Sequence, residues 1–337
     1  MKTIKMKFAA ALALFVLTLS SCSSDDNGPS QDNMSIYATA KANAQLSVLA
    51  SALEKAGLAS TLSSSGSLTV FAPTNEAFNA FLSKNGYADL NAVPVAALKE
   101  ILLNHVLSTK VKSSAIVTGY VKTLAKGSAS TSNTLSMYIE KNTAVDINGG
   151  KANGGATVTT ADIEATNAPV PPADIEATNG VVHIVDGVIG LPTIVTHAIA
   201  NKNFTTLVSA LTYNPASGFA AMLSGTTGSP FTVFAPTNTA FASFLTETGF
   251  SGLSAIPANV LETTLKYHAV AGANVQSSAL TNGQTVNTAA SQSFTINTAG
   301  GAKITDANGR ISNIIITDVQ CSNGIIHAID KVLLPKL

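Results

Sequence analysis

Tryptophan is absent from this 337-residue chain, and charged residues make up only 11% of it. Lysine plus arginine (19) equals aspartate plus glutamate (19), so the formal net charge is zero. Nucleic acids require a basic footprint on their partner, and anionic lipid headgroups attract polybasic segments. The sequence therefore excludes a nucleic-acid partner and a polybasic membrane-surface binder.

Common catalytic signatures are also missing. The chain has no Gly-x-Ser-x-Gly elbow, His-Glu-x-x-His, Cys-x-x-Cys, Walker loop or dinucleotide fingerprint. A metal site needs three or four convergent ligands, and the five histidines form no such cluster in the sequence. We predict a non-enzymatic protein without metal or cofactor. A Ser-His-Asp site built from distant segments stays open as an alternative, since triads ignore sequence order.

An internal repeat determines the architecture. The segment Thr69-Val-Phe-Ala-Pro-Thr-Asn-Glu-Ala-Phe78 has a near copy that begins at Thr232, and 232 − 69 = 163 residues separate the two. Thr-Val-Phe predicts a short strand that ends at the proline, and an amphipathic helix is expected to follow. The side chains expected to cap that helix are those of Thr74, Asn75, Thr237 and Asn238.

A second helix is expected in each repeat, with Pro94 or Pro257 in its first turn. His105 and His268, again 163 residues apart, lie on its apolar face. We interpret each as a semi-buried histidine bonded to the nearby Thr-Asn corner and not as a metal ligand. An earlier helix, from Leu46 to Leu53, is predicted to open the first repeat.

Each repeat closes on Asn-Gly-φ-φ-His-φ-φ-Asp, where φ is apolar. These residues are Asn179, His183 and Asp186 in the first repeat, and Asn323, His327 and Asp330 in the second. An Asn-Gly turn leading into a strand that is apolar on both faces predicts a buried strand with a core histidine. The two aspartates are expected to hold the turns into final strands at 188–192 and 332–335.

The middle of the first repeat holds a local duplication. Residues 161–167 recur identically at 173–179, joined by Ala-Pro-Val-Pro-Pro, a stiff extended linker. Only one copy can occupy the sheet register, so we predict that the other is looped out, and either copy could hold the strand. Earlier in this region, Asn148-Gly-Gly and Asn153-Gly-Gly predict hairpin turns.

The N-terminus predicts export. Residues 1–21 combine lysines with a twelve-residue apolar run, which is too short to span a bilayer. The run ends in Leu-Ser-Ser before Cys22 and resembles a bacterial lipobox, which implies a cleaved signal peptide and lipidation at Cys22. Polar residues 22–33 are predicted to be a tether, and their acidic pair resembles the surface-export signal of Bacteroidota lipoproteins. An ordinary cleaved signal is the alternative. Cys321 then has no disulfide partner and is expected to be inert packing.

The three motifs, in this order and in both repeats, resemble the fasciclin (FAS1) family. This resemblance implies an α+β fold: two tandem domains, each a β-sandwich or wedge of about seven strands flanked by helices, at 34–192 and 193–337. The family's Tyr-His pair is intact as Tyr267-His268, but the first repeat has Asn104 in place of the tyrosine. If that tyrosine binds a partner, the second domain is the better candidate.

The resemblance also implies an extracellular adhesion role. Asp-Ile segments of vertebrate members are tied to integrin binding, but only the dipeptide recurs here, so we do not carry that role over. We expect a lipoprotein anchored to the bacterial outer membrane, surface-exposed, with a periplasm-facing position as the alternative. It is expected to bind a protein or polysaccharide and to make weak homophilic contacts. The alternative is a glycan-capturing component of nutrient uptake, which an aromatic content of 6% disfavours.

Overall fold

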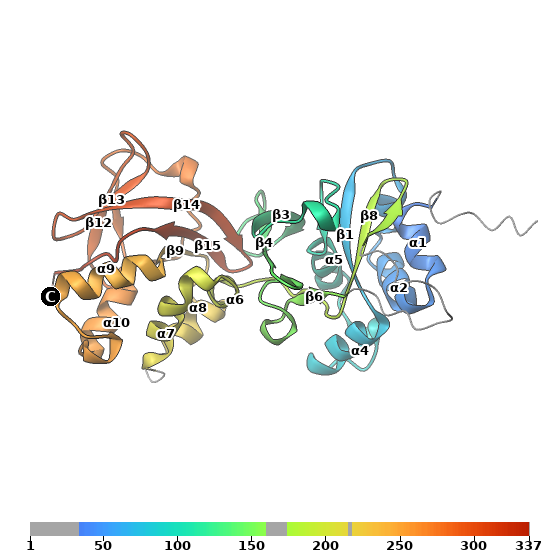
Figure 1. Cartoon of the computed structure of the whole chain (residues 1–337), viewed down its shortest axis with the longest axis horizontal. Helices are drawn as coiled ribbons and strands as arrows, with labels where there is room; N and C mark the ends of the chain where they lie inside the picture. The colour runs from blue at the N-terminus through green and yellow to red at the C-terminus, as the bar shows by residue number, and fades with distance from the viewer. Residues whose placement is uncertain (1–33, 160–173, 215–217, 337) are drawn as a thin grey trace, which may run out of the picture.

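The computed structural model describes residues 34–159, 174–214 and 218–336. Two similar α+β units lie end to end along the long axis of the molecule (Figure 1). Cys22, the signal and tether, and the 161–167 copy of the duplication lie outside the described residues. Among the residues described, no helix has the length and apolar character needed to cross a membrane.

The first unit places helices over a strongly curved sheet. Its helices are α1 (Ile36–Ala42), α2 (Ser47–Lys55), α3 (Ala59–Ser63), α4 (Asn75–Lys84) and α5 (Val95–Leu103). Its strands are β1 (Leu68–Pro73), β2 (Val106–Leu107), β3 (Gly119–Lys126), β4 (Thr134–Lys141), β5 (Val145–Ile147), β6 (Ala156–Val158), β7 (Ile175–Ala177) and β8 (Gly180–Val185). The strands run in the order β1-β2-β3-β4-β5-β6-β8-β7, and β1 also pairs with β8.

The second unit repeats this plan. Its helices are α6 (Ile194–Ala200), α7 (Thr205–Tyr213), α8 (Phe219–Ser224), α9 (Asn238–Thr248) and α10 (Ala258–Tyr267). Its strands are β9 (Phe231–Pro236), β10 (Ala269–Ala271), β11 (Thr285–Asn287), β12 (Ser293–Asn297), β13 (Lys303–Thr305), β14 (Ile311–Cys321) and β15 (Gly324–Ile329). Their order is β10-β9-β15-β14-β13-β12-β11, with irregular register along the long strand β14.

The two repeated motifs pair with one another at the centre of each sheet. In the first unit β1 runs parallel to β8, with Phe71 opposite His183, and in the second β9 runs parallel to β15, with Phe234 opposite His327. Apolar residues fill one layer between helices and sheet and another inside the curved sheet. The α+β fold with about seven strands per unit is therefore confirmed.

Some sequence-based expectations about local structure were wrong. Helices α1 and α6 precede the predicted opening helices; they are too short, at 7 residues each, to show a clear apolar period. Segments 188–192 and 332–335 contain no strand, and the two Asn-Gly-Gly sites form one loop around a 3-10 helix at 151–153. The second copy of the duplication supplies β7, and the first copy, 161–167, lies outside the described residues, so the prediction that it is looped out stays a prediction.

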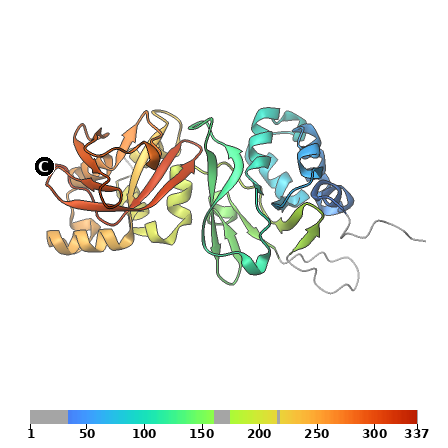
Figure 2. The same ribbon diagram turned by 90° about the horizontal axis from the view of Figure 1, so that it is seen from above.

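The two units share a closely packed junction. Strand β4 of the first unit lies against β14 of the second, and Figure 2 shows the β3–β4 hairpin facing the second unit. The backbone N–H of Gln320 donates to Ser136 Oγ at 3.0 Å, and Lys122 Nζ donates to the Asp318 carbonyl at 2.7 Å. Both hydrogen bonds cross the junction, so they hold the two units in one orientation.

Aromatic rings complete the junction. Tyr120 packs against the core of the second unit, 4.9 Å from the ring of Tyr138 and 5.4 Å from the ring of His197 on α6. His197 is fully buried, and this burial lowers its pKa to about 3. An ion pair between Lys202 and Glu140, at 2.6 Å, lies at the exposed edge of the same contact.

Candidate functional site

The histidines that follow the second predicted helix are structural and fully neutral. His105 is 1% exposed; its Nε2 accepts from the Ile189 backbone N–H at 2.9 Å, so Nδ1 carries the proton and donates to the Ile101 carbonyl at 2.8 Å. His268 repeats both contacts, with Leu333 N–H at 2.9 Å and the Thr264 carbonyl at 2.7 Å. Burial lowers the pKa of each to about 4.

These contacts correct the expected partner of the two histidines. They do not bond the Thr-Asn corner; they hold the segment that follows the last strand of their own unit. The bonded N–H group lies 84 residues from His105 in the first unit and 65 residues from His268 in the second. A backbone N–H has no sequence pattern, so this partner could not be predicted from the sequence. Each imidazole therefore joins a helix end to the closing segment, a purely architectural role.

The histidines of the closing motif lie in the central strands. Nε2 of His183 donates to the Val111 carbonyl at 2.9 Å, and Nε2 of His327 donates to the Val275 carbonyl at the same distance. Each ring stacks on the phenylalanine opposite, with centroids 5.6 Å apart at Phe71 and 5.4 Å apart at Phe234. Burial lowers the pKa of His327.

The motif asparagines fasten two distant segments at once. Asn179 Oδ1 accepts from the Ile36 N–H at the start of α1, and its Nδ2 donates to the carbonyls of Leu62 and Ser64. In the second unit, Asn323 makes the same three contacts. These are with Ile194 N–H at 3.0 Å, and with the Leu223 and Gly225 carbonyls at 2.8 Å each. The side chains therefore tie the first helix to the loop before the central strand.

The threonine and the asparagine of the Thr-Asn corner have different hydrogen-bond partners. Thr74 and Thr237 cap α4 and α9 by accepting from the third backbone N–H, as the sequence predicted. Asn75 and Asn238 lie one residue later and do not cap α4 and α9. They accept from Val48 and Thr206 N–H in the preceding helices, a long-range contact that the sequence did not indicate.

The motif aspartates bind the neighbouring strand. Asp186 Oδ1 accepts from the Thr157 N–H at 2.6 Å, and Asp330 Oδ1 accepts from the Asn313 N–H at 2.7 Å. They anchor the end of the central strand to β6 or β14, and no further strand follows. Asp174, of the Asp-Ile dipeptide, accepts from the Ser113 N–H and so holds a turn.

Tyr267 is closed to any partner. It is 0% exposed; its hydroxyl donates to the Ser293 carbonyl at 2.7 Å and accepts from the Ala307 N–H at 3.1 Å. Its counterpart Asn104 is equally buried and donates from Nδ2 to the Gly190 carbonyl at 2.9 Å. The Tyr-His pair therefore packs and does not favour the second domain as a binding surface.

Tyr267→Phe is expected to lower the free energy of unfolding by about 1–2 kcal/mol, because the half-buried Ala307 N–H and Ser293 carbonyl each lose a partner. Binding of any surface ligand should be unchanged. Urea denaturation and a binding titration on the same preparation would measure both. A variant that kept its stability but lost binding would contradict the buried role.

Neither metal chemistry nor thiol chemistry has a site in the described residues. No group of three or more His, Cys, Asp or Glu side chains converges there. Cys321 is fully buried and burial raises its pKa, so its thiol is inert packing, as expected.

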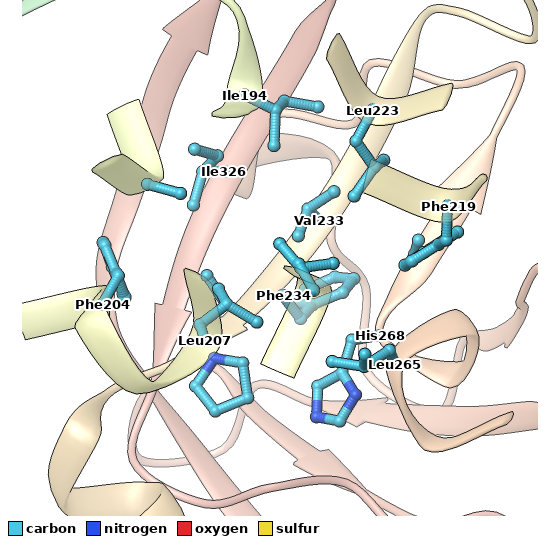
Figure 3. A pocket seen from close by; sticks show the side chains of 15 residues that line it. Ile194, Phe204, Leu207, Phe219, Leu223, Val233, Phe234, Leu265, His268 and Ile326 are labelled. Atoms are coloured by element: carbon cyan, nitrogen blue, oxygen red, sulfur yellow. The ribbon is translucent and has the colours of Figure 1, made fainter. Parts of the chain in front are cut away.

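Two hollows differ in what they can accept. The hollow in Figure 3 lies between α6–α8 and β9 and measures about 20 Å³, with apolar residues around it and His268 at one side. It has room for about one water molecule and is a packing gap. An open cleft of about 190 Å³ lies in the first unit, between α4, the β5–β6 loop and the segment after β8.

Sequence reasoning missed this cleft, which is open to solvent and has polar lining. Lys84 and Phe81 come from α4, Lys151 and Gly154 from the β5–β6 loop, and Val188 from the closing segment. A signal did exist in the sequence. Aligning the repeats places Lys84 where the second has Glu247, a reversal of charge at 247 − 84 = 163.

The chain resembles two proteins of Synechocystis sp. (strain PCC 6803). It is 37% identical over 144 residues to an uncharacterized protein, sll1735, covering 43% of this chain and 98% of that protein. It is 36% identical over 147 residues to protein sll1483, covering 43% and 74%.

Among solved structures, a FAS1 domain pair from the insect cell adhesion molecule fasciclin I matches with a TM-score of 0.47 and 21% identity. The match covers 88% of this chain and 95% of that one. The family model of the fasciclin domain matches twice, over residues 44–192 and 202–335. This chain belongs to the fasciclin domain family.

Proposed function

We propose that this protein is a lipid-anchored, non-catalytic binding lipoprotein of the bacterial cell surface, which presents two fasciclin domains to a protein or polymer ligand. The observation that carries the proposal is the tandem of two domains of a family of binding and adhesion modules. Every motif histidine is engaged in holding the fold, which leaves none of these imidazoles to act as a general base.

The mode of presentation follows from the junction. Hydrogen bonds and packed rings between the units fix their relative orientation, so the tandem offers one composite surface and not two independent ones. Because charge is scarce, binding would come from shape and hydrogen bonding more than from long-range attraction.

Anchoring and exposure are tested together by protease treatment of intact cells that produce the full chain. We expect the wild type to fractionate with membranes and to be cleaved from outside, whereas Cys22→Ala should lose membrane association because the acylated thiol is removed. A chain that resists cleavage until the cells are lysed would remove contact between cells from its roles.

Binding itself is tested with purified Cys22→Ala protein. It should be retained by whole cells, by matrix or by surface polymers, and a heat-unfolded sample is the control. Retention by none of these would overturn the binding function. Retention by surface polysaccharide alone would favour the glycan-capturing alternative over adhesion between cells.

A further inference from the structure

Charged side chains form a cluster at the place in the second domain that corresponds to the cleft of the first. There Arg310 donates from Nη1 to the Val332 carbonyl at 2.8 Å, and its guanidinium also pairs with Glu247 and Asp306. Lys331 Nζ lies 3.3 Å from Glu247. Two cations and two carboxylates take part, so the charges balance, and the guanidinium is bonded to the backbone of Val332.

The repeat relates this cluster residue by residue to the open cleft. Val188 and Gly187 correspond to Val332 and Lys331, since 332 − 188 = 144 is the offset of the closing motif. Lys84 corresponds to Glu247. The first domain has therefore lost the central carboxylate, and a glycine replaces Lys331, which opens the cleft.

The open cleft carries uncompensated positive charge. Lys84 from α4 and Lys151 from the β5–β6 loop both line it, and neither ammonium makes an ion pair within the described part of the chain. The residues that line the cleft include no carboxylate. Two ammonium groups from different elements, without a counter-charge, fit an anionic group placed between them.

The walls of the cleft are held from behind. Asn104 Nδ2 donates to the Gly190 carbonyl, and His105 accepts from the Ile189 N–H, so the closing segment cannot move away. The β5–β6 loop is fixed from the other side, because Asn153 Nδ2 donates to the Thr196 carbonyl of α6 at 2.9 Å. A site that is already in place loses less entropy when a ligand binds.

Size and lining indicate the class of ligand. A volume of about 190 Å³ is below the range of about 300–1,000 Å³ for drug-sized ligands, so one small unit fits. Phe81 offers a partly exposed ring, and Gly154, Gly155 and Gly187 bring the backbone to the wall of the cleft without a side chain that would fill it. A sugar acid carries a carboxylate and several hydroxyls on one compact ring, so a single small unit can meet the two ammonium groups, pack on the Phe81 ring and form hydrogen bonds.

We propose that this cleft binds a carboxylate-bearing sugar unit of an acidic polysaccharide, with Lys84 and Lys151 on its carboxylate. The inference rests on the proposed binding function and names the ligand class of its first domain. The second domain, with its charge cluster closed on itself, would not bind this unit.

The test is calorimetric titration of the full chain carrying Cys22→Ala with a tetramer of glucuronic acid, a neutral glucose tetramer and a glutamate tetrapeptide. Lys84→Gln combined with Lys151→Gln should weaken uronate binding about tenfold or more, because two charge-assisted hydrogen bonds are lost. Lys99→Gln combined with Lys126→Gln, an equal charge change at exposed lysines outside the cleft, is the matched control.

Each outcome decides the question. Binding of the uronate tetramer that is lost in the cleft variant and kept in the control variant supports the proposal. Absence of uronate binding, equal binding by both variants, equal affinity for the neutral tetramer, or preference for the peptide would overturn it. If uronate fails while cells or polymers are still retained, only the ligand class is wrong; if both fail, the binding function is wrong as well.

Discussion

Acidification from pH 7 to pH 5 is expected to cost each domain about 2 kcal/mol of unfolding free energy through one buried histidine, His105 in the first domain and His268 in the second. In the folded chain the pKa values of His105 and His268 are about 4, against about 6.5 in an unfolded chain. At a pH between 4 and 6.5 the imidazole is protonated in the unfolded state and neutral in the folded state, so protonation favours unfolding. Stability is therefore complete above pH 6.5 and declines as the pH falls toward 4.

The pH range from 6.5 to 5 distinguishes the effect of histidine protonation from that of carboxylate protonation. Exposed glutamates in ion pairs, such as Glu176 and Glu247, have lowered pKa values and begin to matter only near the ordinary carboxyl pKa of about 4.5. Losses seen between pH 6.5 and 5 thus come from imidazoles. His197, with a pKa of about 3, adds a similar penalty at the junction.

Urea denaturation at pH 7, 6 and 5 measures the effect, with hydrogen exchange in β1 and β9 to read the two domains separately. His268→Gln serves as a control, because the second domain of this variant should be weaker at pH 7 but lose less on acidification. Stability that stays level from pH 7 to 5, or resonances of His105 and His268 that titrate near 6.5 in the folded protein, would contradict the prediction.

Asn323→Ala should destabilise the second domain by about 3–5 kcal/mol, which places it among the most damaging single substitutions in the chain. Three hydrogen bonds disappear, and the Ile194 N–H and the Leu223 carbonyl are left buried without their partner. Water cannot replace the amide freely, because Asn323 is only 1% exposed.

Asn179→Ala should have the same effect on the first domain, since the contacts are equivalent. Asn203→Ala is the control, because that side chain is exposed and should cost less than about 0.5 kcal/mol. Hydrogen exchange at β9 and β15 for Asn323→Ala, and at β1 and β8 for Asn179→Ala, assigns the loss to a domain. A loss below about 1 kcal/mol in both variants would show that the asparagines do not fasten the helices.

Local chemistry and repetition predicted most of the fold. Thr74 and Thr237 cap their helices because a threonine before an apolar period has a local reason to do so. The two motif strands of each unit were predicted because both copies carry the same apolar runs, whereas their parallel pairing came from the structure. The repeat also indicated that the histidines are architectural.

What the sequence could not predict depends on distant contacts. Asn75 meets the N-terminus of α2 and His105 meets Ile189, and neither partner has a pattern that marks it. The short helices α1 and α6 are stabilised by Asn179 and Asn323, far along the chain. The cleft could not be predicted from the motifs that the two repeats share, because its signal is a difference between them: Lys84 stands where the second repeat has Glu247.

Strand β4 is buried at five successive positions, from Leu135 to Ile139, which means that both of its faces are covered. One face meets the core of its own domain and the other meets β14, so neither half is complete alone. Duplicated domains on loose linkers can be reshuffled between genes as independent cassettes. In this protein a substitution on β4 also changes the surroundings of β14 in the second domain. The two domains should therefore be inherited and recombined together as a single unit.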